Sequence, residues 1–238
     1  MRRVEAPGVA APCSQTMEHI HSEADSLDWL IFETFGDLED LVKEISSYLS
    51  DSADRRRVHA EAYYGYSSDA LLQELEEIDR QVGQEFPRAF TYSLVMLAYS
   101  QFEFFLNEIG NLLCKTLALP VGISSFKGSL VERAGLFFSV FSLYGWSVAE
   151  RRELIDFTLV RNCIAHNAGL IKGAQRERAL RAIIRKTEGL EISKWHSLIV
   201  SLDYCRTEIG FINRMLRRVV FANFYPEEAS TKGPQADA

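Results

Sequence analysis

The sequence predicts an all-α fold in which several helices share one core. Apolar residues recur at three- and four-residue steps over most of the chain, which is the period of helices with a buried face. Pro120 and Gly122 interrupt this pattern, as turn residues between helices do. A chain of 238 residues with 47% apolar and 25% charged residues is long enough to bury such a core without disulfides.

Composition divides the chain into four parts. Both ends are rich in proline and in small or polar residues, which is typical of flexible tails. The predicted division is a flexible N-terminal tail at 1–24, a helical extension at 25–86 that packs on the bundle, the main helical domain at 87–225, and a flexible C-terminal tail at 226–238.

The N-terminal half is predicted to hold three helices. Leucine, isoleucine and phenylalanine recur at helical spacing over 27–49, and a polar connection separates this helix from a second one over 68–85. Pro87 suits the first turn of a third helix, over 87–117, because that turn leaves its N–H groups unpaired. This third helix is apolar on more than one side, which indicates either a central position in the bundle or a subunit interface.

The C-terminal half is predicted to hold the remaining elements. A strongly apolar helix is expected over 130–143. Ser147 and Glu150 have the spacing of a capping box at the start of the next helix, and Gly169 is a natural terminator for it. Three elements then follow: a basic helix over 174–187, a short extended piece over 190–193, and a long helix from about 195 to 224.

Charge differs between the two halves of the chain. Residues 1–150 contain 11 basic and 23 acidic residues, whereas residues 151–238 contain 15 basic and 10 acidic, and the whole chain has a net charge of −7. An acidic chain argues against non-specific binding of long nucleic acid, which depends on neutralising phosphates. The basic half either guides a phosphate ligand to a local site or consists of solvated helix faces.

Several kinds of protein and site are not indicated. The four cysteines are scattered and form no Cys-x-x-Cys pair, which predicts reduced thiols in a cytoplasmic protein and no metal site. No apolar stretch has the length of a signal peptide or a transmembrane helix, so no membrane partner is expected. No Gly-rich phosphate loop occurs, and no cofactor is expected.

One segment concentrates hydrogen-bonding side chains at the end of an otherwise apolar helix: Arg161, Asn162 and His166. Histidine transfers protons near neutral pH and arginine offers a planar donor fork to phosphate, a combination that fits phosphodiester cleavage without a metal. Arg161 and His166 are five residues apart, about 140° around a helix. They converge only if Arg161 swings or the helix end unwinds; otherwise they cap carbonyls or pair with an acid.

The segment LVRNCIAHNAGLI resembles the Arg-x4-6-His signature of the HEPN superfamily, the higher eukaryotes and prokaryotes nucleotide-binding domains. The stretches LVMLAYSQFEFFLNEIGNLL and HSLIVSLDYCRTEIGFINRML resemble the early and closing helices of that bundle. The resemblance covers about residues 87–220. It implies a HEPN-like helical bundle with additional N-terminal helices.

The resemblance also implies a function. Catalytic members are metal-independent endoribonucleases in which the 2′-hydroxyl attacks the adjacent phosphate to give cyclic 2′,3′-phosphate ends, and many are toxins or phage-defence effectors. They work as homodimers with two motifs facing one cleft, on an RNA substrate, and can have an antitoxin or defence-complex partner. By this analogy Arg161 binds the scissile phosphate, Asn162 positions it and His166 transfers protons. The alternative is a non-catalytic HEPN-like module that binds nucleotide, RNA or another protein.

Further candidates for substrate binding surround the motif: Glu103, Asn167, Arg178, Arg181 and Arg185. Glu103 is either a polar residue of the cleft or part of a polar line that faces water. The three arginines share a helix face, which forms either a rim that guides phosphate or an ordinary exposed surface. Three tyrosines in the N-terminal half either stack on bases or fasten the first helices to the bundle: Tyr63, Tyr64 and Tyr66.

Overall fold

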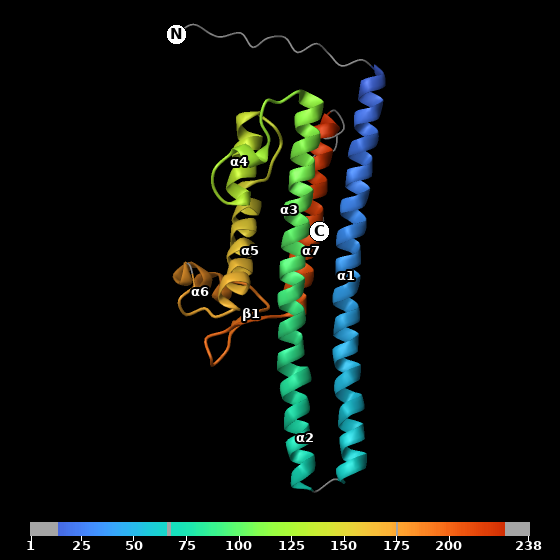
Figure 1. The fold of residues 1–238 in the computed structure, drawn as a ribbon, viewed down its shortest axis with the longest axis vertical. Helices are drawn as coiled ribbons and strands as arrows, with labels where there is room; N and C mark the ends of the chain where they lie inside the picture. Colours follow the sequence, from blue (N-terminus) through green and yellow to red (C-terminus); the bar gives the residue numbers. More distant parts are fainter. Residues whose placement is uncertain (1–13, 66–67, 175, 227–238) are drawn as a thin grey trace.

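The fold, seen in a computed structural model that describes residues 14–65, 68–174 and 176–226, is all-α with one small sheet, which confirms the predicted fold class. Figure 1 shows the arrangement of its elements. In chain order these are α1 (Ser14–Tyr64), α2 (Asp69–Arg80), the π-helical turn η1 (Gln81–Glu85), α3 (Phe86–Leu117), the short 3-10 helix η2 (Ile123–Ser125), α4 (Leu130–Val140), α5 (Val148–Asn167), α6 (Glu177–Lys186), the strands β1 (Leu190–Ile192) and β2 (Leu198–Val200), and α7 (Leu202–Phe224).

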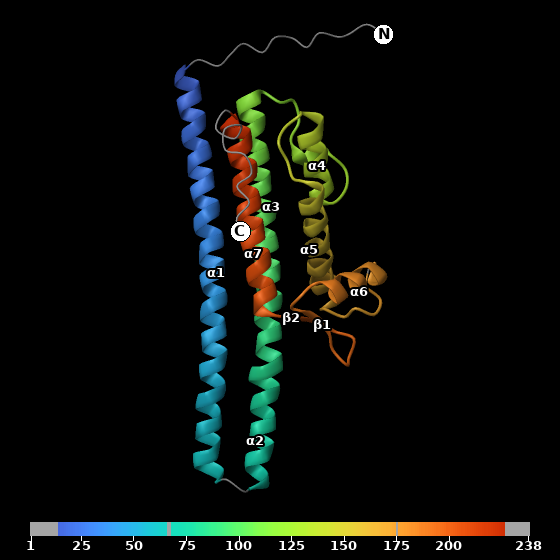
Figure 2. The same cartoon turned by 180° about the vertical axis from the view of Figure 1, so that it is seen from behind.

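Three long helices, α1, α3 and α7, run side by side and form the spine of the molecule (Figures 1 and 2). Their buried side chains belong to one core, in which the rings of Phe35 and Phe105 lie 6.0 Å apart. Arg217 of α7 holds both carboxylate oxygens of Asp28 on α1, at 2.9 and 3.0 Å. The core therefore continues across the boundary predicted at residue 86, and α1 is an integral part of the bundle.

Helix α1 is one continuous helix of 51 residues, so two predictions about this region are wrong. The tail predicted at 1–24 is helical from Ser14, because Ile20 and Ala24 are buried in the core; residues 1–13 lie outside the described part. The polar connection predicted after residue 49 is helical as far as Tyr64. Its charges are matched by the antiparallel α2, as in the 2.6 Å ion pair between Arg57 and Asp79.

Helices α2 and α3 follow one another through η1 without a change of direction, and with the far half of α1 they extend beyond the rest of the bundle (Figure 1). In the wider π-helical turn, the N–H of Phe86 donates to the carbonyl of Gln81. Pro87 then lies in the first turn of α3, as predicted, so the residue without an N–H falls where the hydrogen-bond pattern changes from π-helical to α-helical.

Helices α4 and α5 form a second layer beside α3 (Figures 1 and 2). Each begins with a capping box, Ser129 with Glu132 and Ser147 with Glu150, which confirms the cap predicted at Ser147. In such a box the serine oxygen accepts a backbone N–H and the glutamate carboxylate accepts another, so two donors at the helix start are satisfied.

The chain returns to α7 through a β-hairpin. Leu190–Ile192 is extended, as predicted, and pairs antiparallel with Leu198–Val200. The helix predicted from about residue 195 is therefore wrong at its start, because Leu198 and Val200 are buried while Ile199 between them is exposed, the alternation of a strand. Ser201 caps α7 by accepting the N–H of Tyr204. Among the described helices, none is long and apolar enough to cross a membrane.

Candidate functional site

The three predicted catalytic residues lie on the last two turns of α5. The helix is regular through Asn167, after which Ala168 and Gly169 take left-handed conformations with φ of 48° and 78°. The N–H groups of both residues donate to the carbonyl of Cys163, as in a glycine-terminated helix end. The helix thus does not unwind before His166, which removes one of the two ways for Arg161 and His166 to converge within one chain.

The guanidinium of Arg161 is held between α5 and α3. Its central carbon lies 4.5 Å from the ring centroid of Tyr99 on α3, and its Nη1 donates to the side-chain oxygen of Asn162 at 3.0 Å. Its Nε is buried and has no hydrogen-bond acceptor among the described residues. The arginine is therefore fixed in position while one of its donors stays unused.

A second arginine, Arg133 of α4, approaches the same tyrosine. Burial raises the pKa of Tyr99, a hydrogen bond with Thr158 and the charges of Arg161 and Arg133 lower it, and the charge of Glu103 raises it further. The Nε of Arg133 is also buried without an acceptor among the described residues. We call Tyr99, Arg133, Thr158, Arg161 and Asn162 the Arg161 cluster.

A groove of about 270 Å³ opens beside Asn162. Its polar lining includes the side chains of Ser129, Thr158 and Arg176, of which Arg176 precedes α6 and is exposed. The hydroxyls of Ser129 and Thr158 already donate to Glu132 and to the carbonyl of Leu154, and the carboxylate of Glu132 also lines the groove. Arg176 and the amide of Asn162 are therefore the donors that the groove offers to a phosphate group.

His166 lies apart from the Arg161 cluster. It is exposed in the last turn of α5, where a cationic side chain is favoured by the unpaired carbonyls of the helix end. Within the described residues it makes no hydrogen bond to Arg161, whose guanidinium is turned towards Tyr99. One chain therefore supplies the two halves of the predicted site on different sides of α5.

Of the predicted substrate-binding residues, the structure places only Glu103 beside the Arg161 cluster, half-buried one turn from Tyr99. Asn167 closes the helix end by donating to the carbonyl of Leu170 at 3.2 Å. The arginines of α6 make no described contact with the cluster: Arg181 pairs with Glu177, while Arg178 and Arg185 are exposed.

Sequence reasoning missed Tyr99, Arg133 and Thr158. Helix geometry is enough to predict that Tyr99 lies near Glu103, because it precedes Glu103 by four residues and so shares its face of α3. Thr158 likewise precedes Asn162 by four residues on α5. Arg133 had no comparable signal, since its position depends on how α4 packs against α3 and α5.

The end of α5 is clamped to α3 and β2. The hydroxyl of Tyr92 donates to the carbonyl of Leu198 at 2.6 Å, and Arg88 donates to the carbonyl of Ala168 at 3.1 Å. A Cβ atom on Gly169 would lie 1.9 Å from the Tyr92 hydroxyl, so only glycine fits there. These contacts set the direction in which α5 ends and hence the position of His166.

Metal and thiol chemistry find no support in the described residues. They contain no group of three or more His, Cys, Asp or Glu side chains that could hold a metal ion. Burial raises the pKa of Cys163 to about 11 and that of Cys205 to about 12, so neither thiol is activated as a nucleophile.

Comparisons with protein-family models, with curated proteins and with solved structures find no match to this chain.

Proposed function

We propose that this chain is a metal-independent endoribonuclease of the HEPN type, acting as a toxin or phage-defence effector. The observation that carries the proposal is the fixed guanidinium of Arg161, stacked on Tyr99 and joined to Asn162, on the helix that ends at exposed His166. An arginine held in this way is suited to bind a phosphate and to stabilise the charge that develops on it.

In the proposed reaction the 2′-hydroxyl of RNA attacks the adjacent phosphorus atom. The bond from phosphorus to the 5′-oxygen breaks, which leaves a cyclic 2′,3′-phosphate on one product and a 5′-hydroxyl on the other. Arg161 binds the non-bridging oxygens and Asn162 orients them, while His166 transfers a proton to or from the reacting oxygens. No metal takes part in these steps.

A homodimer completes the proposed site. His166 and Arg161 lie on different sides of α5 within one chain, so a second chain is needed to bring a histidine to the arginine. Leu97 and Phe104, two turns apart on α3, are 40% and 50% exposed and offer an apolar surface for a second chain, on the side of α3 about 140–160° away from Tyr99.

His166→Ala is expected to lower RNA cleavage by about 100- to 10,000-fold, the range for loss of a group that transfers protons in the transition state. The measurement is cleavage of total cellular RNA by the purified protein in the presence of EDTA, with the product ends tested for cyclic 2′,3′-phosphate. His196→Ala is the matched control, since His196 is an exposed histidine in the β-hairpin turn. Equal cleavage by wild type and His166→Ala would contradict the proposal.

The separation of His166 from Arg161 also favours a second candidate, a module that binds RNA or a nucleotide without cutting it. The groove beside Asn162 would then hold a phosphate through Arg176 and the amide of Asn162. This candidate predicts that RNA raises the melting temperature of the protein while no cleavage occurs, and that Arg176→Ala removes that stabilisation.

A further inference from the structure

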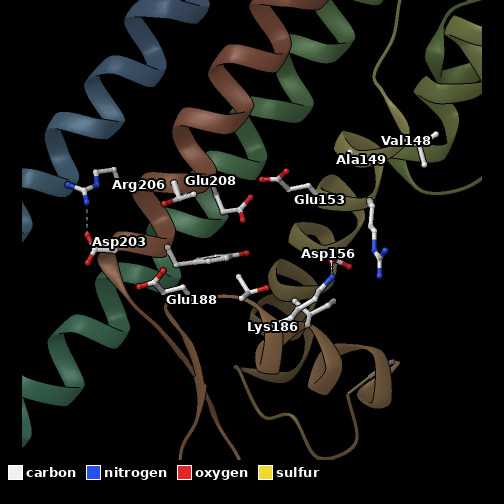
Figure 3. A pocket seen from close by; sticks show the side chains of 14 residues that line it. Val148, Ala149, Glu153, Asp156, Lys186, Glu188, Asp203, Arg206 and Glu208 are labelled. Carbon is white, nitrogen blue, oxygen red and sulfur yellow. Dashed lines mark hydrogen bonds and ion pairs between the residues drawn. The ribbon is translucent and has the colours of Figure 1, made fainter. Parts of the chain in front are cut away.

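A second cavity, which shares no residue with the Arg161 cluster, lies between α5, α6 and α7. Its volume is about 1020 Å³, the size of a site for a small organic ligand. Figure 3 shows Glu153 on α5 and Glu208 on α7 extending towards one another across it. Val148, Ala149 and Ile183 add apolar surface to the walls.

Glu208 is a buried carboxyl group with an unused oxygen. Its side chain is only 7% exposed, and its Oε2 atom has no hydrogen-bond partner among the described residues. Burial, and then the charge of Glu153, raise the pKa of Glu208 to about 8, although the hydroxyl of Tyr204 donates to the carboxyl. A buried acceptor without a donor costs free energy, so this position suits a ligand that brings a donor.

Three basic side chains line the cavity, Arg152, Lys186 and Arg206, and the last two are engaged with other acids. Lys186 pairs with Asp156 at 2.6 Å. Arg206 pairs with Asp203 at 2.8 Å. These pairs leave Glu153 and Glu208 facing one another, and burial raises the pKa of Glu153 as well, although Arg214 opposes that rise. The inner end of the cavity is therefore acidic and poorly solvated.

We propose that this cavity binds a small organic cation, a primary ammonium group on an aliphatic chain, through Glu153 and Glu208. An ammonium group has three N–H donors, enough to reach both carboxyls, and a buried carboxyl needs such a partner. The apolar wall residues suit the aliphatic chain. A metal ion does not fit, because the described residues supply no group of three ligands. The proposal is independent of RNA cleavage.

Binding of the cation displaces the proton of Glu208. The groups that face this carboxyl are Tyr204 from its own helix and Glu153 and Asp156 from α5, while Lys186 of α6 lies in the same cavity. With its pKa at about 8, Glu208 is mostly protonated near neutral pH. An ammonium ion favours the charged carboxylate, so the cavity releases a proton when the ligand enters.

The probe for this site is spermidine, a chain with ammonium groups at both ends, titrated calorimetrically near neutral pH. We expect one site per chain, with a proton released that phenol red detects in weakly buffered solution. Glu208→Gln is expected to weaken binding by about ten-fold or more and to abolish proton release, and Glu153→Gln to weaken binding as well. Glu191→Gln is the matched control, because Glu191 is exposed on β1 outside the cavity.

Two results would overturn the proposal. If Glu208→Gln and Glu153→Gln both bind spermidine as wild type does, the amine is held by the general negative charge of the surface. If folded wild-type protein takes up no spermidine and releases no proton at millimolar concentrations, the cavity is not an amine site.

Glu208→Gln also tests whether the carboxyl group of Glu208 is buried and unpaired, as the proposal requires. Folding raises the pKa of Glu208 from 4.5 to about 8. Between these two pH values the unfolded chain loses the proton more readily than the folded chain, so the free energy of unfolding falls as the pH rises from about 4.5 to about 8. The melting temperature of Glu208→Gln should therefore exceed that of wild type by an amount that grows from about pH 5 to about pH 8. A constant difference over this range would contradict the buried, unpaired state of Glu208.

Discussion

Replacement of Arg161 by alanine is expected to lower RNA cleavage by about 100- to 1,000-fold, the loss measured when a single donor to transition-state charge is removed. The substitution removes the guanidinium that Tyr99 and Asn162 hold in place. The rate should be measured under single-turnover conditions, with the melting temperature of the variant recorded beside it. Arg178→Ala is the control, because Arg178 is an exposed arginine of α6 outside the cluster.

Arg161→Lys separates charge from geometry. Lysine keeps the positive charge but cannot lie flat on the ring of Tyr99 or offer a fork of two donors to a phosphate. Its cleavage rate should therefore fall between those of wild type and Arg161→Ala. If Arg161→Ala and Arg178→Ala cleave RNA equally well, Arg161 has a structural role only.

Gly169→Ala is expected to produce the largest loss of stability. Its φ of 78° costs a residue with a side chain about 1–2 kcal/mol, and the added Cβ would lie 1.9 Å from the Tyr92 hydroxyl. Displacing Tyr92 also strains its hydrogen bond to Leu198. A total of about 3 kcal/mol would lower the melting temperature by roughly 6–12 °C for a chain of this size.

Gly173→Ala is the matched control for this prediction. Gly173 has a similar φ of 81°, but a Cβ there would meet no atom within 4 Å. Gly173→Ala therefore measures only the cost of placing a residue with a side chain in a left-handed backbone conformation. The double variant Gly169→Ala with Tyr92→Phe removes the clashing hydroxyl, so Gly169→Ala should cost less in that background than in wild type. Equal melting temperatures for Gly169→Ala and Gly173→Ala would show that the Tyr92 contact is unimportant.

The parts of the fold that the sequence predicts correctly are those governed by local chemistry. The capping box at Ser147 and the glycine terminator at Gly169 are satisfied within a few residues of the chain, so their spacing is enough to predict the ends of α5. The same holds for Pro87, which marks the first turn of α3.

The errors arise where contacts distant in sequence decide the structure. The polar stretch after residue 49 is helical because α2 supplies opposite charges to Arg56 and Arg57, through Glu74 and Asp79. Strand β2 exists because it pairs with β1 and because the buried Leu198 and Val200 alternate with an exposed residue. Neither partner can be recognised from the local sequence.

In the candidate site, too, the local sequence predicts some features, while others depend on contacts distant in sequence. The motif residues Arg161, Asn162 and His166 were found from the residue types, but the partner of Arg161 was not, because Tyr99 lies on another helix. The 140° between Arg161 and His166 was a prediction from helix geometry. The regular end of α5 keeps that separation, which is why the proposed site takes its histidine from a second chain.

The central claim is that Arg161 of one chain acts with His166 of another, and mixing two inactive variants tests it most directly. Arg161→Ala and His166→Ala chains with different tags would be co-expressed and the mixed dimer isolated. In a two-fold symmetric dimer one of the two sites then contains both native residues, so the mixed dimer should cleave RNA at about half the wild-type rate while each parent is inactive. A mixed dimer as inactive as its parents would contradict the account.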